Sequence, residues 1–282
     1  MTSLGPSRLV TRVGHAVRSL ARRHPVATFV ALAYLLSWTW WLPLVLAGAT
    51  VRVGMGWPTH LPGLAGPALA ALIVTALAEG RPGLRALGRR TARWRVGGWW
   101  LSVLAILGVG AFALLGTGGP ASAAGLTGYP GVARSWDPLA TLAFVFLVNG
   151  VGEEVGWRGF AVERLVERRS LVVTALIVAL AWAPWHLPLF FLTESFRAFT
   201  AAGVMGWAIG LTAGSIVLAW LYRGSGGSVL LVSAWHTAFN LVSATPAASG
   251  AVAAASSTVV MAAAVAIVVV EARARRRRRG GA

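Results

Sequence analysis

Long apolar runs restrict this 282-residue chain more than any other feature of its sequence. The runs are about 17 to 24 residues long, and each is long enough to cross a hydrocarbon core about 30 Å thick. Hydrophobic residues make up 57% of the chain and charged residues 12%. A soluble domain of this size carries about twice that charged fraction. The sequence therefore excludes a cytosolic globular enzyme and predicts an all-α polytopic membrane protein.

Eight of the runs are predicted to be transmembrane helices within one transmembrane domain, residues 26–270. A basic segment, residues 1–25, comes before this domain, and an arginine-rich tail, residues 271–282, follows it. Residues 117–138 are rich in Gly, Ala, Ser and Pro, which predicts an external loop. The predicted spans are 26–48, 61–79, 99–116, 139–162, 171–192, 201–222, 228–244 and 251–270.

Two rows of glycines recur at every fourth residue inside these spans. Gly152 and Gly156 form one row, and Gly206, Gly210 and Gly214 form the other. Glycines at this spacing let helix backbones approach closely in lipid. Both rows are therefore predicted to be packing seams.

The basic residues indicate topology. The formal net charge is +17, and every basic residue is an arginine. With the N-terminus in the cytoplasm, 21 of the 25 arginines fall in segments on the cytoplasmic side, as the positive-inside rule requires. We therefore expect an integral protein of the bacterial plasma membrane with both termini in the cytoplasm. The basic segments are expected to contact anionic lipid, and no nucleic-acid partner is expected.

Three groups of polar side chains interrupt the apolar spans. An ionisable group in the middle of a bilayer is costly, so such residues are functional candidates by default. The chain has no cysteine, which excludes thiolate catalysis and thiolate metal sites. The candidates lie in spans four, five and seven, and they are Glu153, Glu154 and Arg158, then His186, then His236 with Asn240.

Helical spacing predicts how the first group is arranged. Glu154 and Arg158 are four residues apart, so they share a helix face and can form an ion pair. Glu153 is rotated by about 100° from Glu154 and has no evident helical partner, which makes it the better general base. His236 and Asn240 are also four residues apart. Counting along the helices from the polar turns places the three groups at a similar depth, on the cytoplasmic side of the midplane.

These motifs resemble those of the CAAX prenyl protease 2/Abi family of intramembrane endopeptidases, also called CPBP proteins. The family pattern is EExxxR on one span, an aromatic residue followed after three residues by His, and HxxxN on a later span. The chain has Glu153-Glu154-Val-Gly-Trp-Arg158, then Trp182-Ala-Pro-Trp-His186, then His236-Thr-Ala-Phe-Asn240. The resemblance covers about residues 139–244. Trp182 stands where Phe is common, a difference expected to leave the chemistry unaffected.

The resemblance implies hydrolysis of a peptide bond in a membrane-associated protein or peptide. Glu153 with His186 would activate water, His236 and Asn240 would donate to the oxyanion, and Glu154 with Arg158 would hold the site together. In a second version Glu153, His186 and His236 would be ligands of Zn²⁺. The HExxH motif of soluble zinc proteases is absent, and metal-independent activation of water is slightly favoured.

Two functions of other classes remain open at this point. The same buried Glu, Arg and His could form a proton relay in a proton-coupled transporter, because intramembrane carboxylates commonly do so. Inverted repeats would favour a transporter, and none is evident. The chain could also be a non-proteolytic membrane scaffold or immunity protein that retains the motifs. The presence of every catalytic-type residue argues mildly against that function.

Overall fold

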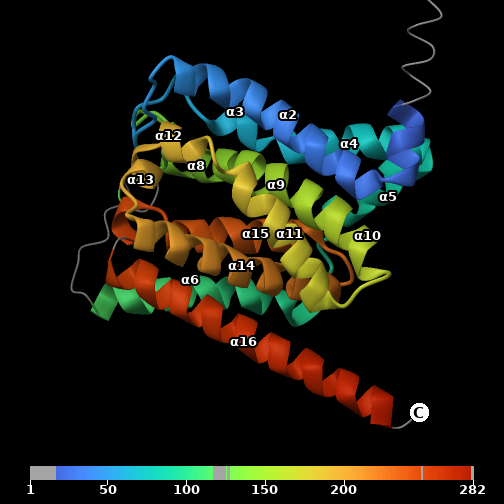
Figure 1. Ribbon diagram of the computed structural model, residues 1–282. Coiled ribbons are helices and arrows are strands. Elements are labelled where there is room, and N and C mark those ends of the chain that lie inside the picture. The colour runs from blue at the N-terminus through green and yellow to red at the C-terminus, as the bar shows by residue number, and fades with distance from the viewer. Residues whose placement is uncertain (1–16, 117–124, 126–127, 249, 281–282) are drawn as a thin grey trace, which may run out of the picture.

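A computed structural model describes residues 17–116, 125, 128–248 and 250–280, and these residues form an α-helical bundle (Figure 1). No strand forms among them. The only β-type pairs within these residues are three isolated bridges, and all three involve the segment from Val51 to Gly54. The predicted all-α class is thus confirmed. The predicted external loop at 117–138 falls partly outside the described residues.

The bounds of the helices follow the apolar runs closely. Two segments, η2 and η3, are π-helical and flank the short helix α9. The elements are α2 (Pro25–Leu46), α3 (Leu61–Leu64), α4 (Gly66–Ala78), α5 (Gly80–Thr91), η1 (Gly97–Trp100), α6 (Leu101–Gly116), α8 (Pro138–Val145), η2 (Phe146–Val151), α9 (Gly152–Gly156), η3 (Trp157–Val162), α10 (Glu163–Val166), α11 (Leu171–Trp185), α12 (Leu189–Leu192), α13 (Glu194–Arg197), α14 (Ala201–Gly224), α15 (Val229–Leu241), η4 (Pro246–Ala248) and α16 (Ala251–Gly280).

Seven helical stretches of the described chain are long and apolar enough to cross a membrane. They correspond to seven of the eight predicted spans. The predicted span at 228–244 differs, because α15 has only 13 residues. At 1.5 Å per residue it is about 20 Å long, which is too short to cross a core of about 30 Å on its own. Other helices surround most of α15, so it can end inside the bundle.

Hydroxyl and carboxylate caps determine where several helices begin. The side chains of Ser170, Thr200 and Ser228 each accept a hydrogen bond from a backbone N–H in the first turn of α11, α14 and α15. Asp137 does the same for α8 and is followed by Pro138. A capping side chain satisfies an N–H that the helix itself leaves unpaired. These polar residues therefore divide the apolar sequence into separate helices.

The helices lie in layers, with the segment from α8 to α10 in the middle (Figure 1). Helices α2 and α4 pack together on one side of it, and α4 contacts α9 directly. Helix α11 crosses the same region and packs on α14. Helix α15 packs on η2 and α6, and α16 covers α14 and α6. Spans four, five and seven, which carry the candidate residues, therefore meet in the interior.

One glycine row forms the predicted packing seam and the other does not. A Cβ atom at Gly156 would lie 2.6 to 2.7 Å from atoms of Pro67, and one at Gly152 would lie 3.1 Å from the Leu64 carbonyl oxygen. These glycines let α9 lie against α3 and α4. A Cβ at Gly206, Gly210 or Gly214 would have no neighbour within 4 Å. The prediction of a seam on α14 was therefore wrong, because no neighbouring backbone approaches this row closely enough to require glycine.

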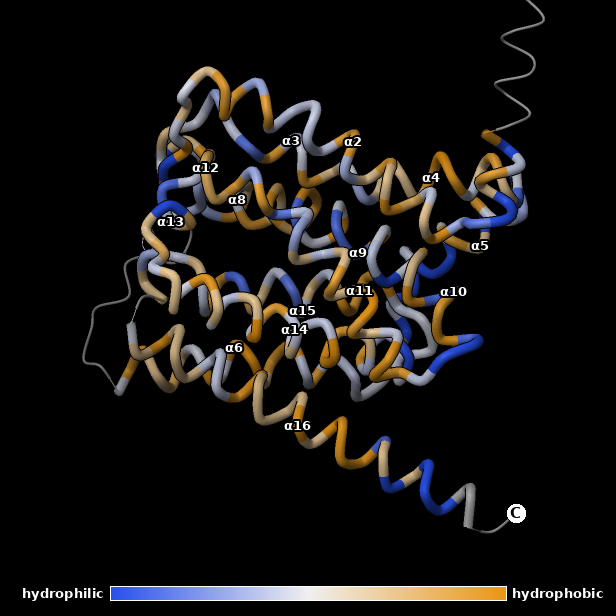
Figure 2. The backbone as a smooth tube through the Cα atoms, viewed as in Figure 1, coloured by the Kyte–Doolittle hydropathy of each residue, from blue (hydrophilic) through white to orange (hydrophobic). Residues whose placement is uncertain are grey.

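Hydrophilic segments lie around α5 and in the C-terminal part of α16 at one end of the bundle, and a second group lies around α13 at the other end (Figure 2). Helix α2 begins at the same end as α5 (Figure 1). This placement agrees with the expectation that the basic segments share one side of the membrane.

The orientation can be tested by cysteine labelling, since the chain has no native cysteine. We expect a Gly280→Cys variant in intact cells to be protected from a membrane-impermeant thiol reagent, because the basic tail is predicted to be cytoplasmic. A Leu46→Cys variant at the opposite end of α2, where Leu46 is 86% exposed, should be labelled. Labelling at position 280 with protection at position 46 would reverse the predicted topology.

Candidate active site

The two adjacent glutamates lie on a helix that is interrupted by π-helical turns on both sides. Glu153 and Glu154 belong to α9, with η2 before it and η3 after it. Turns of this type inside α-helices change the direction of side chains and occur frequently at functional sites. Glu153 and Glu154 are both buried, as is Arg158. The π-helical turns therefore accompany three buried ionisable groups within six residues.

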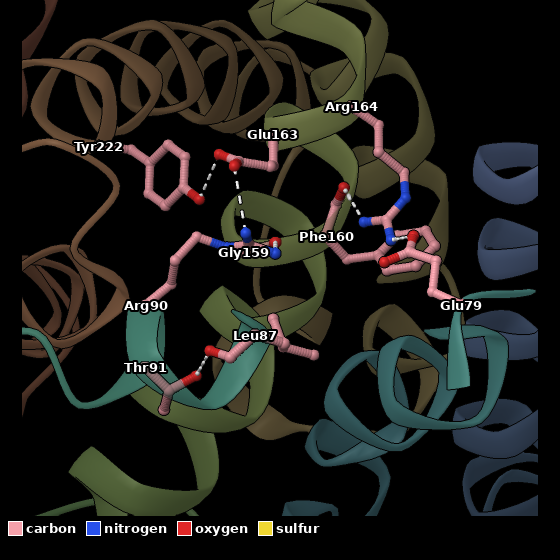
Figure 3. A network of polar contacts seen from close by, with 9 residues as sticks. All are labelled: Glu79, Leu87, Arg90, Thr91, Gly159, Phe160, Glu163, Arg164 and Tyr222. Atoms are coloured by element: carbon pink, nitrogen blue, oxygen red, sulfur yellow. Dashed lines mark hydrogen bonds and ion pairs between the residues drawn. The ribbon is translucent and has the colours of Figure 1, made fainter. Parts of the chain in front are cut away.

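The carbonyl groups of η3 are bound by arginines from outside the site (Figure 3). Arg90 of α5 donates to the Gly159 carbonyl oxygen at 3.3 Å, and Arg164 donates to the Phe160 carbonyl oxygen at 3.1 Å. Arg90 also pairs with Glu163 at 3.2 Å, and Tyr222 donates to the other oxygen of Glu163 at 2.8 Å. This network fixes the end of the helix that carries Arg158.

Glu154, Arg158 and His236 form one buried hydrogen-bonded group. Arg158 Nη1 lies 2.7 Å from Glu154 Oε1, as the spacing of four residues predicts. The same oxygen also accepts a hydrogen bond from His236 Nδ1 at 2.9 Å. A carboxylate that accepts from Nδ1 fixes the ring orientation and leaves Nε2 on the opposite edge of the imidazole. Glu154 therefore orients His236 as well as pairing with Arg158.

Glu153 is not the unpartnered carboxylate that the sequence suggested. Its Oε1 accepts a hydrogen bond from Asn149 Nδ2 at 2.8 Å, and its Oε2 accepts one from Trp182 Nε1 at 2.7 Å. Asn149 lies four residues before Glu153, the same spacing that links Glu154 to Arg158. That spacing was the signal in the sequence that could have identified Asn149 as part of the site.

His186 lies at the end of α11, where Pro184 and Pro188 interrupt the regular helix. Tyr34 and Trp38 of α2 donate to the carbonyl oxygens of Ala181 and Trp185, at 2.6 and 3.0 Å. His186 Nδ1 lies 2.8 Å from the Trp182 carbonyl oxygen, which can only accept a hydrogen bond. Nδ1 therefore carries the proton, and Nε2 of the neutral ring has a free lone pair.

Asn240 reaches Glu153 only through Asn149. Asn240 Nδ2 donates to Asn149 Oδ1 at 2.7 Å, and Asn149 in turn donates to Glu153. Asn240 is less buried than the other candidates and retains a second N–H on the same amide nitrogen. All six residues selected from the sequence are thus brought together in the interior, with Asn149 and Trp182 between them.

Trp182 changes the site in a way that the sequence did not indicate. The indole N–H that binds Glu153 would be absent from a phenylalanine. The Arg158 guanidinium carbon also lies 4.3 Å from the centroid of the Trp182 ring. The expectation that a tryptophan at this position leaves the chemistry unaffected therefore conflicts with a direct contact to Glu153.

The three metal ligands considered from the sequence are Glu153, His186 and His236. Among the described residues, no three His, Cys, Asp or Glu side chains are placed to share one metal ion. Nδ1 of His186 donates to a carbonyl, Nδ1 of His236 donates to Glu154, and both oxygens of Glu153 accept hydrogen bonds. Contacts of this kind at Nδ1 also accompany metal-ligating histidines and leave Nε2 free, so the difference from a Zn²⁺ site lies in the placement of the three side chains alone.

Tyr129 is a further residue near the site that the sequence analysis missed. It lies before α8 in the loop that the bridges tie to Val53 and Gly54, and it is buried. Burial, and then the charge of nearby Glu153, raise the pKa of Tyr129 above its usual value. The hydroxyl group therefore stays protonated and can donate a hydrogen bond.

Comparison with known proteins finds a match for the region that contains the residues of the three motifs. Residues 135–242 match the family of type II CAAX prenyl endopeptidases described as Rce1-like. The chain is also 28% identical over 102 residues to a protein named CAAX prenyl protease 2 from Methanococcus maripaludis. That alignment covers 35% of this chain and 38% of the relative. The chain thus spans less than half the length of the curated relative that it matches.

Proposed function

We propose that this chain, which carries a region of the CAAX protease family at residues 135–242, is an intramembrane endopeptidase. Its substrate would be a membrane-associated protein or peptide, and the reaction would be hydrolysis of one peptide bond. One observation carries the proposal: three motifs from three helices meet around Glu153, a carboxylate that is only 1% exposed. A buried ionisable group with designated partners is a typical feature of catalytic sites.

In the proposed mechanism Glu153 accepts a proton from a water molecule while His186 orients that water. His186 is suited to this role because Nδ1 is engaged and Nε2 can accept a hydrogen bond. The oxygen of the water attacks the peptide carbonyl carbon, and the proton passes from Glu153 to the leaving amine. The hydroxyl of the water stays on the new carboxyl group, so the atoms of the reaction balance.

His236 and Asn240 are proposed to stabilise the oxyanion that forms during this attack. Donors aimed at a developing charge in a site without bulk water contribute strongly to catalysis. His236 can donate to the oxyanion from Nε2 when both of its ring nitrogens carry a proton, with Nδ1–H bound to Glu154. Asn240 can donate through its second amide N–H. Arg158 balances the charge of Glu154 and is proposed to hold the site together.

We place the protein in the bacterial plasma membrane with both termini in the cytoplasm, and we expect anionic lipid at its arginine-rich ends. A proton relay in a transporter would use the same types of buried residue. The similarity of residues 135–242 to prenyl endopeptidases favours hydrolysis over that function.

Reconstitution into liposomes separates the two activities in one experiment. The purified chain is placed in vesicles that contain a pH-sensitive dye and a library of membrane-anchored peptides. We expect cleaved peptides in the mass spectrum and no change in the decay of an imposed pH gradient, because hydrolysis moves no net charge across the membrane. Dissipation of the gradient without any peptide cleavage would overturn the proposed function.

A further inference from the structure

Trp182 contacts more members of the candidate site than any other described residue that the mechanism leaves unused. Its indole N–H donates to Glu153, and its carbonyl oxygen accepts from His186. Its ring lies under the Arg158 guanidinium and meets the His236 ring edge-on, with centroids 5.5 Å apart. Trp182 is only 5% exposed. It therefore contacts residues of all three motifs from one position in α11.

Asn149 complements Trp182 on the other oxygen of Glu153. Its amide nitrogen donates to Oε1 at 2.8 Å, while the indole donates to Oε2 at 2.7 Å. The Asn149 amide oxygen is held in turn by Asn240, which fixes which end of the amide faces Glu153. Each carboxylate oxygen can accept two hydrogen bonds. One lone pair on each oxygen of Glu153 thus remains for water.

These two neutral donors oppose the effect of burial on Glu153. Removing a carboxylate from water disfavours its charged form, and hydrogen bonds to that form favour it. The other ionisable groups that bear on Glu153 are Glu154 and Arg158 on its own helix, His236 of α15 and Tyr129 of the loop before α8. His186 faces the same region from the end of α11. Trp182 and Asn149 differ from these groups because their N–H donors contact the Glu153 oxygens directly, at 2.7 and 2.8 Å.

We propose that the Trp182 indole N–H and the Asn149 amide N–H form a two-donor clamp that orients the Glu153 carboxylate and keeps it ionised inside the membrane. Trp182 and Asn149 are positioning residues, because they act through Glu153. This inference rests on the proposed function, in which Glu153 activates water. According to this proposal, the chain needs an indole N–H at position 182, and a phenylalanine there would not provide one.

The test is the pH dependence of peptide hydrolysis by a Trp182→Phe variant. This substitution removes the N–H and keeps an aromatic ring against Arg158 and His236. Because a hydrogen bond to the charged form is lost, we expect the acidic limb of the pH–kcat profile to move upward by about one pH unit. At a pH below the limb, kcat should fall about tenfold, while KM stays within about twofold of wild type.

Trp185→Phe provides a matched control three residues further along the same helix. The Trp185 indole N–H donates to Ser37 Oγ at 2.9 Å, and Trp185 is also fully buried. The control loses the same chemical group from the same helix, but away from Glu153. We expect it to lower thermal stability without moving the acidic limb. If Trp182 had only a structural role, Trp182→Phe would lower kcat by the same factor at every pH and leave the acidic limb in place.

Asn149→Leu is the second variant, and it covers the case in which Trp182→Phe does not fold. It removes the other donor at nearly constant volume and should move the limb in the same direction. If the acidic limbs of Trp182→Phe and Asn149→Leu both coincide with that of wild type while Glu153→Gln is inactive, the proposal of a two-donor clamp is wrong and the proposed function stands. If Glu153→Gln keeps the wild-type rate, the proposed function fails instead.

Discussion

A Glu153→Gln variant is expected to hydrolyse a verified peptide substrate at least about 100-fold more slowly than wild type, the scale of losing a general base. The amide is close in size to the carboxylate but cannot accept the proton of the attacking water. His186→Ala should cause a loss of similar scale, because it removes the Nε2 lone pair that orients the water. Initial rates with purified protein in detergent measure both effects.

Glu163→Gln is the matched control for this prediction. Glu163 begins α10 directly after η3, and it pairs with Arg90 and Tyr222 outside the site (Figure 3). The same chemical change there should leave kcat within about threefold of wild type, since no catalytic group is altered. If Glu153→Gln and His186→Ala both kept near wild-type turnover, these residues would not be the catalytic base and its partner.

Arg158→Ala is expected to cause the largest loss of stability among the site variants. Arg158 and Glu154 are both fully buried, and Arg158 also covers the Trp182 ring. Removing one partner of a buried ion pair leaves an uncompensated charge, which typically costs about 3 to 5 kcal/mol. For a chain of this size that corresponds to a decrease in Tm of about 5 to 8 °C. Thermal unfolding in detergent measures the loss, and activity should fall with it.

Two comparisons distinguish this effect from a general loss of an arginine or of a carboxylate. Arg52→Ala removes an ion pair with Glu194 in which both side chains are 61% exposed, and should cost no more than about 1 kcal/mol. In Glu153→Gln the new side-chain amide N–H faces one of the two donors, Asn149 or Trp182. That donor loses its hydrogen bond, which costs about 1 to 3 kcal/mol of stability. Arg158→Ala should therefore melt lowest. If Glu153→Gln melted far below Arg158→Ala, the structural and catalytic roles would have to be exchanged.

Much of the fold follows from the sequence because lipid imposes a simple rule on length and polarity. A run that must satisfy its backbone hydrogen bonds internally becomes a helix, and its bounds follow from caps such as Ser170 and Asp137. The rule fails for α15. That helix is apolar because protein surrounds most of it, and composition alone does not distinguish burial in protein from burial in lipid.

The sequence predicted which residues belong to the candidate site better than it predicted which of them contact one another. Spacing by four residues correctly predicted the Glu154–Arg158 pair, since both side chains lie on one helix. The same rule was not applied to Asn149 and Glu153, because a neutral amide was not counted among the costly groups. The Trp182 contact joins residues 29 positions apart, and no helical periodicity specifies it. Contacts between helices had to come from the structure.

Hydrolysis of a peptide in water enriched in ¹⁸O tests the central claim most directly. The wild-type protein is allowed a single turnover on a membrane-anchored peptide, and both the product and the peptides that contain Glu153 are analysed by mass spectrometry. If Glu153 activates water, the new carboxyl terminus of the product carries one ¹⁸O atom and Glu153 carries none. An intact peptide, or ¹⁸O found in Glu153 and not in the product, would contradict the account.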